Sequence, residues 1–489
     1  MSNEIVYASA VGLARKIHDR ETSSRAVVDV FLARIAQHNP AINAVVVLQA
    51  DIARRRAEAA DAARANGVSW GPLHGVPITV KDSFDVQGLP STFGLAALGG
   101  NIAARDALTV ERLQAAGAIV LGKTNVPPNL ADWQTIHPVY GTTRNPWDVT
   151  RTPGGSSGGS AAALASGFSA LEIGSDIGGS IRMPAHYCGV WGHKPSFGLV
   201  PGRGHAKPGS VAPSDITVYG PLARSAGDLA LALDVMAGPD PEAGAGWRLD
   251  LDPPGPRLAD RYRVALWADD PAFPVDASVS DALHAAADSL RRSGVDVDET
   301  ARPAFDSRDA YEIYVHLLRA ATSGRQSDAD WDANIAAASG LDPADRSYRA
   351  LFLRGNVLTH RDWVGFEQRR HGLIQAWRDF FSRYDAVLCP VASTPAFTLV
   401  GDTPKHARQV TVNGKDEPSA NDYFWLGLAS ASYLPSTTAP IGVSGAGLPV
   451  GAQLIGRFGS DRTCMALAQH LERHHYGFAI PPLFRKAIL

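Results

Sequence analysis

The chain of 489 residues carries 46 lysine and arginine side chains against 49 aspartates and glutamates, a formal net charge of −3. Because this balance offers no excess positive charge to a phosphate backbone, we expect no nucleic-acid partner. Hydrophobic residues make up 45% of the chain and charged residues 19%, which is typical of a globular protein and excludes a disordered one.

The three cysteines, Cys188, Cys389 and Cys464, are too few and too scattered for a disulfide framework or a zinc site. Free thiols are typical of a reducing compartment, so we expect a cytoplasmic protein. The N-terminal residues lack the basic segment and apolar run of a signal peptide, and no stretch has the roughly 18 apolar residues of a membrane span. We therefore expect no membrane association.

The N-terminal region, residues 1–65, is predicted to be helical and to pack on the core or on a partner subunit. Apolar residues at helical spacing follow a polar capping segment at 22–24, and the Asn39-Pro40 pair predicts the end of this helix. A segment rich in alanine and arginine predicts a second helix over 50–65.

Residues 66–240 contain most of the glycine and alternate between strand and helix patterns. We predict a strand over 76–86, a short helix over 106–117 and a buried strand over 118–122. Strands separated by helices imply an α/β fold with a large central mixed, mostly parallel β-sheet that helices cover on both faces.

A segment rich in glycine and proline, 238–256, predicts a linker. The following region, 241–384, then begins with a βαβ unit. It consists of a strand over 262–268, a helix over 277–293 and another strand after Gly294.

The rest of that region, 308–384, is predicted to be a helical elaboration that is rich in aromatic residues and lies on the substrate side. One apolar stripe follows the last of its helices: Phe366, Leu373, Trp377 and Phe380. We interpret the stripe as packing against the sheet domain, with the wall of a substrate pocket as the alternative.

Residues 385–489 are predicted to complete the same sheet. The expected elements are a strand over 385–393, a hairpin over 408–418 that turns at Asn413-Gly414, a strand over 448–456 and a helix that ends near 474.

Two clusters of glycine and serine, 154–160 and 174–180, are the most unusual feature of the chain. A flexible linker does not explain the first cluster, because an alanine-rich helical pattern follows it directly. Neither cluster has the GxxxxGK[ST] pattern of a phosphate loop. We interpret both as loops in which glycine lets backbone N–H groups and serine hydroxyls approach a ligand closely.

The second cluster, from Asp176 to Ser180, places a serine next to amide groups that could stabilise an oxyanion. The nearby histidines lack an obvious carboxylate partner, so a serine–histidine pair is not supported. A neutral lysine can act as the base instead, because burial disfavours the charged form of lysine. Lys81 lies on the predicted strand, opposite its apolar face; an edge position or an ion pair with Asp82 is the alternative.

Three segments in this order resemble the amidase signature family: GPLHGVPITVKD (71–82), GGSSGGS (154–160) and GSDIGGSIRMPAHYCGVWGHKPS (174–196). Four other segments are also similar to that family: GKTNVPPN (122–129), YGTTRNPWD (140–148), GPLARS (220–225) and LPVGAQLIG (448–456). The resemblance extends over most of the chain, and the spacing of the segments agrees with it.

The resemblance implies the amidase signature fold and an amidase with a triad of two serines and a lysine. Ser180 would be the nucleophile, Ser156 the bridging serine that follows a cis peptide bond, and Lys81 the base. Other roles follow from the same positions. They are an oxyanion hole from the backbone of Ile177, Gly178, Gly179 and Ser180, support by Ser157, Arg182 and Asp176, and substrate binding by Leu130, Trp133 and Gly155.

The implied partner is a small-molecule substrate, a linear and neutral amide; the aromatic residues favour an aryl or extended apolar one. No metal and no organic cofactor are implied, and a homodimer is left open. The alternative function is the glutamine-hydrolysing subunit of a tRNA-dependent amidotransferase. A catalytically inactive binding protein is disfavoured, because all three catalytic positions are filled.

Three other residues could suggest further sites. His193 stands where the family has an apolar residue, and we expect it to pack behind the site. His470 and His474 are four residues apart on the predicted last helix, but without a third ligand nearby we expect them to be surface residues. Cys188 is expected to be part of the packed core.

Overall fold

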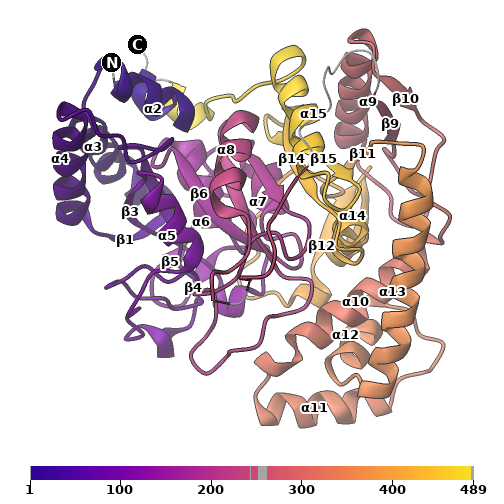
Figure 1. The fold of residues 1–489 in the computed structure, drawn as a ribbon. Helices are drawn as coiled ribbons and strands as arrows, with labels where there is room; N and C mark the ends of the chain where they lie inside the picture. Colours follow the sequence, from indigo (N-terminus) through magenta and orange to yellow (C-terminus); the bar gives the residue numbers. More distant parts are fainter. Residues whose placement is uncertain (1, 243, 252–261, 486–489) are drawn as a thin grey trace.

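The computed structural model describes residues 2–242, 244–251 and 262–485, which are built around one large sheet (Figure 1). Its strands are β1 (Val45–Leu48), β2 (Pro77–Lys81), β3 (Ile119–Thr124), β6 (Leu171–Asp176), β7 (Trp191–Lys194), β8 (Val218–Ala223), β9 (Arg263–Leu266), β10 (Asp296–Asp298), β11 (Ala386–Pro390), β14 (Ser436–Val443) and β15 (Pro449–Gly456). They form an 11-stranded sheet in the order β1-β3-β2-β6-β8-β7-β14-β15-β11-β9-β10.

The predicted large mixed sheet is confirmed, and its parallel pairs lie in two groups. Parallel pairing joins β3, β2 and β6 near one edge and β11, β9 and β10 near the other. The strands between these groups, and β1 at the edge, pair antiparallel. One reason is that a short turn over 444–448 joins β14 to β15, and parallel strands need a much longer crossover.

Helices cover both faces of this sheet. Ser436 and Thr437 are neighbours on β14 and therefore point to opposite faces. Through one intervening side chain each, Ser436 is linked to Arg182 and Thr437 to Asp461. Arg182 belongs to α7 (Arg182–Cys188), which packs beside α6 (Gly158–Ser166), and Asp461 belongs to α15 (Asp461–His474), which packs beside α8 (Ala226–Met236) and α9 (Ala277–Arg292).

The N-terminal region is helical, but two details differ from the prediction. Its helices are α1 (Ser2–Val6), α2 (Ala10–His18), α3 (Ser24–Ile42) and α4 (Ala50–Ala65). Helix α3 continues past Asn39-Pro40, because a proline in the last turn removes only one backbone hydrogen bond; the helix ends where Asn43 is left-handed, with φ 57°. Strand β1 was not predicted within this region.

The βαβ unit of the second half is confirmed, since β9 and β10 pair in parallel across α9. The hairpin is also confirmed: β12 (Gln409–Val412) pairs with β13 (Lys415–Pro418), and Asn413 and Gly414 have φ angles of 50° and 78°. This hairpin forms a sheet of its own. Of the predicted linker over 238–256, residues 243 and 252–256 lie outside the described residues.

The predicted helical elaboration forms the lower right of Figure 1 and consists of α10 (Ser307–Thr322), α11 (Asp328–Ser339), α12 (Tyr348–Asn356) and α13 (His360–Phe381). Leu373, Trp377 and Phe380 on α13 are buried, which confirms that the stripe packs. The ring of Phe366 stacks on His316 of α10 at 4.1 Å between ring centroids. The remaining helices include α5 (Leu108–Ala115), α14 (Asp422–Ser430) and α16 (Pro482–Arg485).

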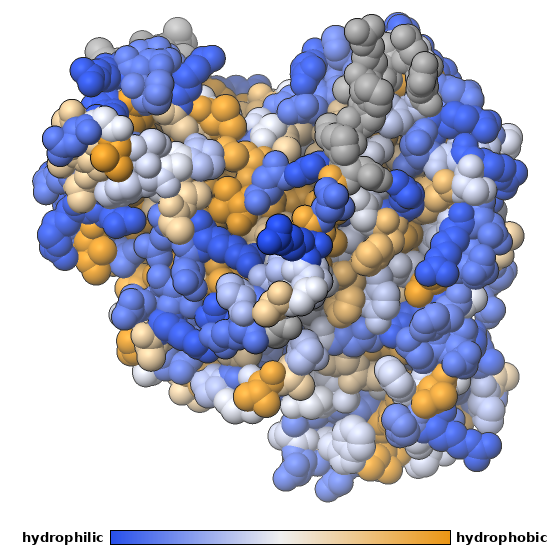
Figure 2. All heavy atoms as spheres, in the orientation of Figure 1, coloured by the Kyte–Doolittle hydropathy of each residue, from blue (hydrophilic) through white to orange (hydrophobic). Residues whose placement is uncertain are grey.

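The surface of the protein is mainly hydrophilic on the face shown in Figure 2, where hydrophobic residues lie in small groups between charged ones. Within the described ranges, no helix is both long and apolar enough to cross a bilayer.

Candidate active site

Lys81 is the last residue of β2, and its side chain is completely buried. Its Nζ lies 2.8 Å from the hydroxyl of Ser156 and 2.9 Å from the hydroxyls of Ser157 and Ser175. An ammonium group donates three hydrogen bonds, whereas a neutral amine donates two and accepts one. Three hydroxyls can satisfy either form, because a hydroxyl both donates and accepts.

The protonation of Lys81 is set by its burial. Burial lowers the pKa of Lys81 to about 7, although the nearby carboxylate of Asp176 favours the ammonium form. The alternative of an ion pair with Asp82 is not found. One carboxylate oxygen of Asp82 instead accepts hydrogen bonds from residues 92–93. A substantial fraction of Lys81 is therefore neutral near pH 7.

The first glycine–serine cluster leads into α6 and contains a cis peptide bond between Gly155 and Ser156. Gly155 is needed for space, because a Cβ atom there would lie 2.2 Å from the backbone oxygen of Asp132. The predicted substrate contact of Gly155 is not found: it is buried behind Asp132 and does not line the pocket described below.

The second cluster begins where β6 ends at Asp176. The Asp176 carboxylate accepts hydrogen bonds from the backbone N–H groups of Gly179 and Ile181, at 2.9 and 3.1 Å. Arg182 donates to the same carboxylate through Nε and Nη2, at 3.1 and 3.0 Å. Burial would raise the pKa of Asp176, but the contact with Arg182 lowers it to about 2. The buried pair thus holds the loop that precedes and includes Ser180.

Three of the four amides expected to bind an oxyanion are available. Among the described residues, no hydrogen bond uses the backbone N–H of Ile177, Gly178 or Ser180. The backbone N–H of Gly179 is the exception, because it donates to Asp176. The predicted part of Gly179 in the oxyanion hole is therefore not found. Gly179 also has a φ of 90°, which favours glycine at this position.

Two aromatic side chains orient these amides by holding the loop carbonyls. The hydroxyl of Tyr314 donates to the carbonyl oxygen of Ile177 at 2.7 Å, and Nε1 of Trp133 donates to that of Gly178 at 2.9 Å. The C=O and the following N–H of a trans peptide point in opposite directions. The bond from Tyr314 therefore directs the N–H of Gly178 away from α10.

Tyr314 was not found by the sequence analysis. It lies 137 residues after Ile177, in the helical region predicted as a whole to face the substrate, and no local pattern marks this residue.

Ser180 lies at the pocket surface and is 6% exposed. Its backbone oxygen accepts a hydrogen bond of 3.2 Å from the N–H of Ser157, so the two glycine–serine clusters are joined. Within the described residues, no hydrogen bond links the hydroxyl of Ser180 to Ser156 or Lys81. The structure thus brings Lys81 and Ser156 into contact and places Ser180 on the adjoining loop.

The sequence analysis also missed a contact between a histidine and two serines. Nε2 of His205 lies 3.0 Å from the hydroxyl of Ser175 and 2.9 Å from that of Ser83. Ser175 in turn contacts Lys81. Burial and the charge of Lys81 lower the pKa of His205 well below its ordinary value, so this imidazole is neutral.

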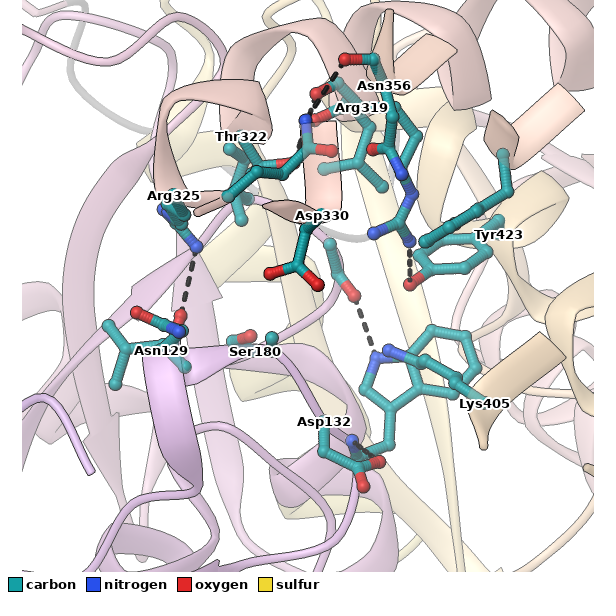
Figure 3. A pocket seen from close by; sticks show the side chains of 18 of the residues that line it. Asn129, Asp132, Ser180, Arg319, Thr322, Arg325, Asp330, Asn356, Lys405 and Tyr423 are labelled. Atoms are coloured by element: carbon teal, nitrogen blue, oxygen red, sulfur yellow. Dashed lines mark hydrogen bonds between the residues drawn. The ribbon is translucent and has the colours of Figure 1, made fainter. Parts of the chain in front are cut away.

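A cavity of about 390 Å³ lies beside Ser180, between the core loops and the helical elaboration (Figure 3). The core wall includes Leu130, Trp133, Ile177 and Gly178, so the predicted positions of Leu130 and Trp133 at the pocket are found. The opposite wall comes from α10, α11, α12, α14 and two short turns, η3 (Ser323–Arg325) and η4 (Lys405–Ala407). Its side chains include Arg319, Thr322, Arg325, Asp330, Asn334, Phe352, Asn356, Lys405 and Tyr423.

The other residues singled out by sequence lie elsewhere. His193 is buried and contacts Asp461 at 3.0 Å on the sheet face covered by α15, in agreement with a packing role. Cys188 is fully buried, which raises the pKa of its thiol. His470 is only 6% exposed, so its expected surface position is wrong, whereas His474 is exposed. In the described part of the chain, no cluster of His, Cys, Asp or Glu could hold a metal ion.

The chain is similar to known proteins over most of its length. Residues 26–465 match the Amidase family. The chain is 36% identical to an indoleacetamide hydrolase of Bradyrhizobium diazoefficiens, over 94% of this chain and 85% of that protein. It is 35% identical to a glutamyl-tRNA(Gln) amidotransferase subunit of Anaeromyxobacter sp. (strain K), over 94% of each chain.

Solved structures show the same likeness. A bacterial aryl acylamidase of the amidase signature family superposes with a TM-score of 0.80 and 26% identity, over 96% of each chain. Family, fold and the class of reaction thus agree over nearly the whole chain.

Proposed function

The chain belongs to the amidase family, and on that premise we propose that it hydrolyses the C–N bond of a linear amide through Ser180, Ser156 and Lys81. The observation that carries this proposal is the buried amine of Lys81 in contact with the hydroxyl of Ser156, directly beside the loop of Ser180. A buried lysine with a pKa of about 7 can act as a general base at neutral pH.

In the first half-reaction, neutral Lys81 accepts a proton from Ser156 while Ser156 accepts the proton of Ser180. The oxygen of Ser180 forms a bond to the amide carbon, and the carbonyl oxygen becomes negative. Because no hydrogen bond joins Ser156 and Ser180 in the described residues of the free protein, the Ser180 side chain must rotate toward Ser156 when substrate is bound. Catalytic hydrogen bonds are often completed only in the substrate complex.

The tetrahedral intermediate then collapses. The C–N bond breaks, and the proton held by Lys81 returns through Ser156 to the leaving nitrogen. Water attacks the resulting ester at Ser180 and gives a proton to the same relay. The bond between the acyl carbon and the Ser180 oxygen then breaks, the relay returns the proton to that oxygen, and the acid is released. The free N–H groups of Ile177, Gly178 and Ser180 are the donors available to the oxyanion in both steps.

The aromatic pocket wall supports an aryl or extended acyl group. Trp133, Phe352 and Tyr423 line the cavity beside Ser180. Two proteins similar to this chain are named for aryl substrates, an indoleacetamide hydrolase and an aryl acylamidase. The neutral charge of the substrate stays a prediction, and three cationic side chains, Arg319, Arg325 and Lys405, line the same pocket.

The second candidate is the glutamine-hydrolysing subunit of an amidotransferase. It is favoured by the 35% identity to a glutamyl-tRNA(Gln) amidotransferase subunit over 94% of each chain. A protein of that kind would need partner proteins for its activity, whereas an independent amidase would not.

The experiment is to assay the purified chain alone against indole-3-acetamide, acetanilide, an extended fatty amide and glutamine. Steady release of ammonia or amine from one of the first three, lost in Ser180→Ala, is the expected result. Activity on glutamine that appears only after partner subunits are added would favour the second candidate. The cytoplasmic location and the homodimer stay predictions, which cell fractionation and light scattering would test.

A further inference from the structure

The pocket beside Ser180 carries an excess of positive charge. Three cationic side chains reach it from separate elements: Arg319 from α10, Arg325 from η3 and Lys405 from η4 (Figure 3). Two carboxylates, Asp132 and Asp330, share the lining.

Neither of these carboxylates neutralises the three cations. Asp132 is held by a different residue, Arg408, whose Nη1 and Nη2 donate to its two oxygens at 2.7 and 3.1 Å. Asp330 accepts hydrogen bonds from the hydroxyl and the N–H of Ser327 and closes the capping box of α11. Neither forms an ion pair with a cation of the pocket in the described part of the chain.

Arg319 and Lys405 have neutral partners. Nη2 of Arg319 donates to the hydroxyls of Tyr348 and Tyr423, at 2.8 and 2.9 Å. Nζ of Lys405 lies 3.9 Å from the centre of the Trp133 ring, a cation–π contact. These contacts position the two cations. The carboxylate of Asp132 favours the charged form of Lys405 without forming an ion pair with it, and no carboxylate of the described residues forms an ion pair with Arg319.

Arg325 has the fewest partners of the three. Its Nη1 donates to the backbone oxygen of Asn129 at 3.0 Å, and among the described residues no carboxylate oxygen lies within 4.0 Å of it. A guanidinium has five N–H donors in a fixed plane, so most of them stay available. Burial and the charge of Arg319 lower the pKa of Arg325, and a bound anion would favour its charged form.

We propose that this pocket binds a substrate that carries a carboxylate in addition to its scissile amide, with Arg325 as the main anchor of that carboxylate. The inference rests on the proposed amide hydrolysis at Ser180 and adds the class of substrate. A carboxylate matches the guanidinium fork with two parallel hydrogen bonds and offsets the positive charges of Arg325 and Arg319. The cavity of about 390 Å³ is of the size that holds a small organic molecule.

The test compares amides that differ only in this charge. Succinamate, glutaramate and 4-carbamoylbenzoate are each paired with the compound in which an acetyl group replaces the carboxylate: 4-oxopentanamide, 5-oxohexanamide and 4-acetylbenzamide. Both members of a pair have nearly the same shape. For at least one pair we expect kcat/KM to favour the carboxylate by about tenfold or more.

Three variants locate the anchor. Arg325→Gln should lower the ratio of kcat/KM between charged and neutral partner by about 10- to 100-fold, and Arg325→Lys should keep part of it, because the charge stays but the fork is lost. Lys207→Gln is the matched control. Lys207 is also half-buried and contacts Asn129, through the side-chain oxygen at 3.2 Å, but it does not line the pocket. Its replacement should leave the ratio unchanged.

A binding measurement separates this inference from the proposed hydrolysis. Calorimetry with Ser180→Ala and each of the six compounds should show tighter binding of the carboxylate at low salt, weakened in Ser180→Ala/Arg325→Gln. Neutral amides that are hydrolysed while no carboxylate is preferred would overturn the anion site and leave the amidase intact. Carboxylates bound through Arg325 without hydrolysis of any amide would support the site and contradict the amidase. A preference that survives in Arg325→Gln would overturn the role of Arg325.

Discussion

The core loops on one side of the pocket and helix α11 on the other differ sharply in burial and in how their residues are arranged. On the core side, every residue from Thr152 to Asp176 is buried, and the proposed catalytic serines lie on two short loops at the ends of this stretch. On the opposite side, α11 has no buried residue at all, and its side chains reach the pocket from a helix largely exposed to solvent.

We infer from this difference a division of roles, in which the core side carries out proton transfer and the opposite side selects the substrate. Groups that move protons must be held in place and kept from water. The loop that includes Ser180 meets this need, because it is buried and is fixed by the contact between Asp176 and Arg182. Groups that select a substrate only need to reach it, so they can come from exposed helices that vary without disturbing the core. Four predictions test this division, in order of expected effect.

The largest effect is expected from Ser180→Ala. Without the nucleophile, kcat should fall by roughly four orders of magnitude or more. The melting temperature should stay nearly the same, because the hydroxyl of Ser180 makes no hydrogen bond among the described residues. Ser160→Ala is the control: Ser160 lies in the other cluster and contacts Thr124 at 3.0 Å, so it should lose stability rather than activity. Comparable kcat losses in both variants would contradict the assignment.

The next effect concerns the lysine. Lys81→Met should lower kcat/KM by about 10² to 10⁴-fold, because the base is lost. Lys194 is an equally buried lysine with a pKa lowered to about 7 by burial, but its Nζ donates to the backbone oxygens of Leu434 and Pro195. Lys194→Met should therefore retain most of the activity of each folded molecule. A near-normal rate in Lys81→Met would remove the proton relay.

The third prediction concerns Tyr314, which belongs to the helical side of the pocket but contacts the catalytic loop. Tyr314→Phe removes the hydrogen bond to Ile177 and should lower kcat roughly tenfold with little change in KM, because the oxyanion exists only in the transition state. Tyr311→Phe on the same helix removes a contact to Ala420 at 3.3 Å and should not change kcat. A change in KM alone would assign Tyr314 to substrate binding.

The smallest effect is a local one on α11. Ser327→Ala removes the capping box and should destabilise this helix by about 1 kcal/mol. Hydrogen exchange of its amides should then be about fivefold faster, with no change in β6. Ser339→Ala, at the other end of the helix, should have no effect. Equal acceleration in β6 would show that the two sides unfold together.

The residues of the catalytic side could be predicted from sequence because the segments that carry them resemble the amidase signature family. Gly155 and Gly179 mark loops that only glycine allows, and Lys81 stands at the end of an alternating strand. The pocket wall could not be predicted in this way. Arg325 and Lys405 lie far apart on segments without any pattern, and only the packing of α10, α12 and α14 brings them to Ser180. The predicted boundaries between the regions 1–65, 66–240, 241–384 and 385–489 stay predictions.

The order of the strands in the sheet could likewise not be predicted from the sequence. Alternating elements indicated the sheet, but the antiparallel centre depends on which strands become neighbours, and that is decided by contacts between residues far apart in the chain. Strand β1 illustrates this, because its short apolar run is a strand only through its pairing with β3.

The most direct test of the proton relay is the pH dependence of Ser180 phosphonylation by a fluorophosphonate probe, with the labelled residue identified by mass spectrometry. The pKa of Lys81 is about 7, so the base is protonated below that pH and neutral above it. We expect the labelling rate to rise about tenfold per pH unit below pH 7 and to level off above it, and Lys81→Met to lose this rise. A rate in the wild-type protein that is flat across pH 7, or that rises only near the ordinary lysine pKa of about 10.4, would contradict the relay.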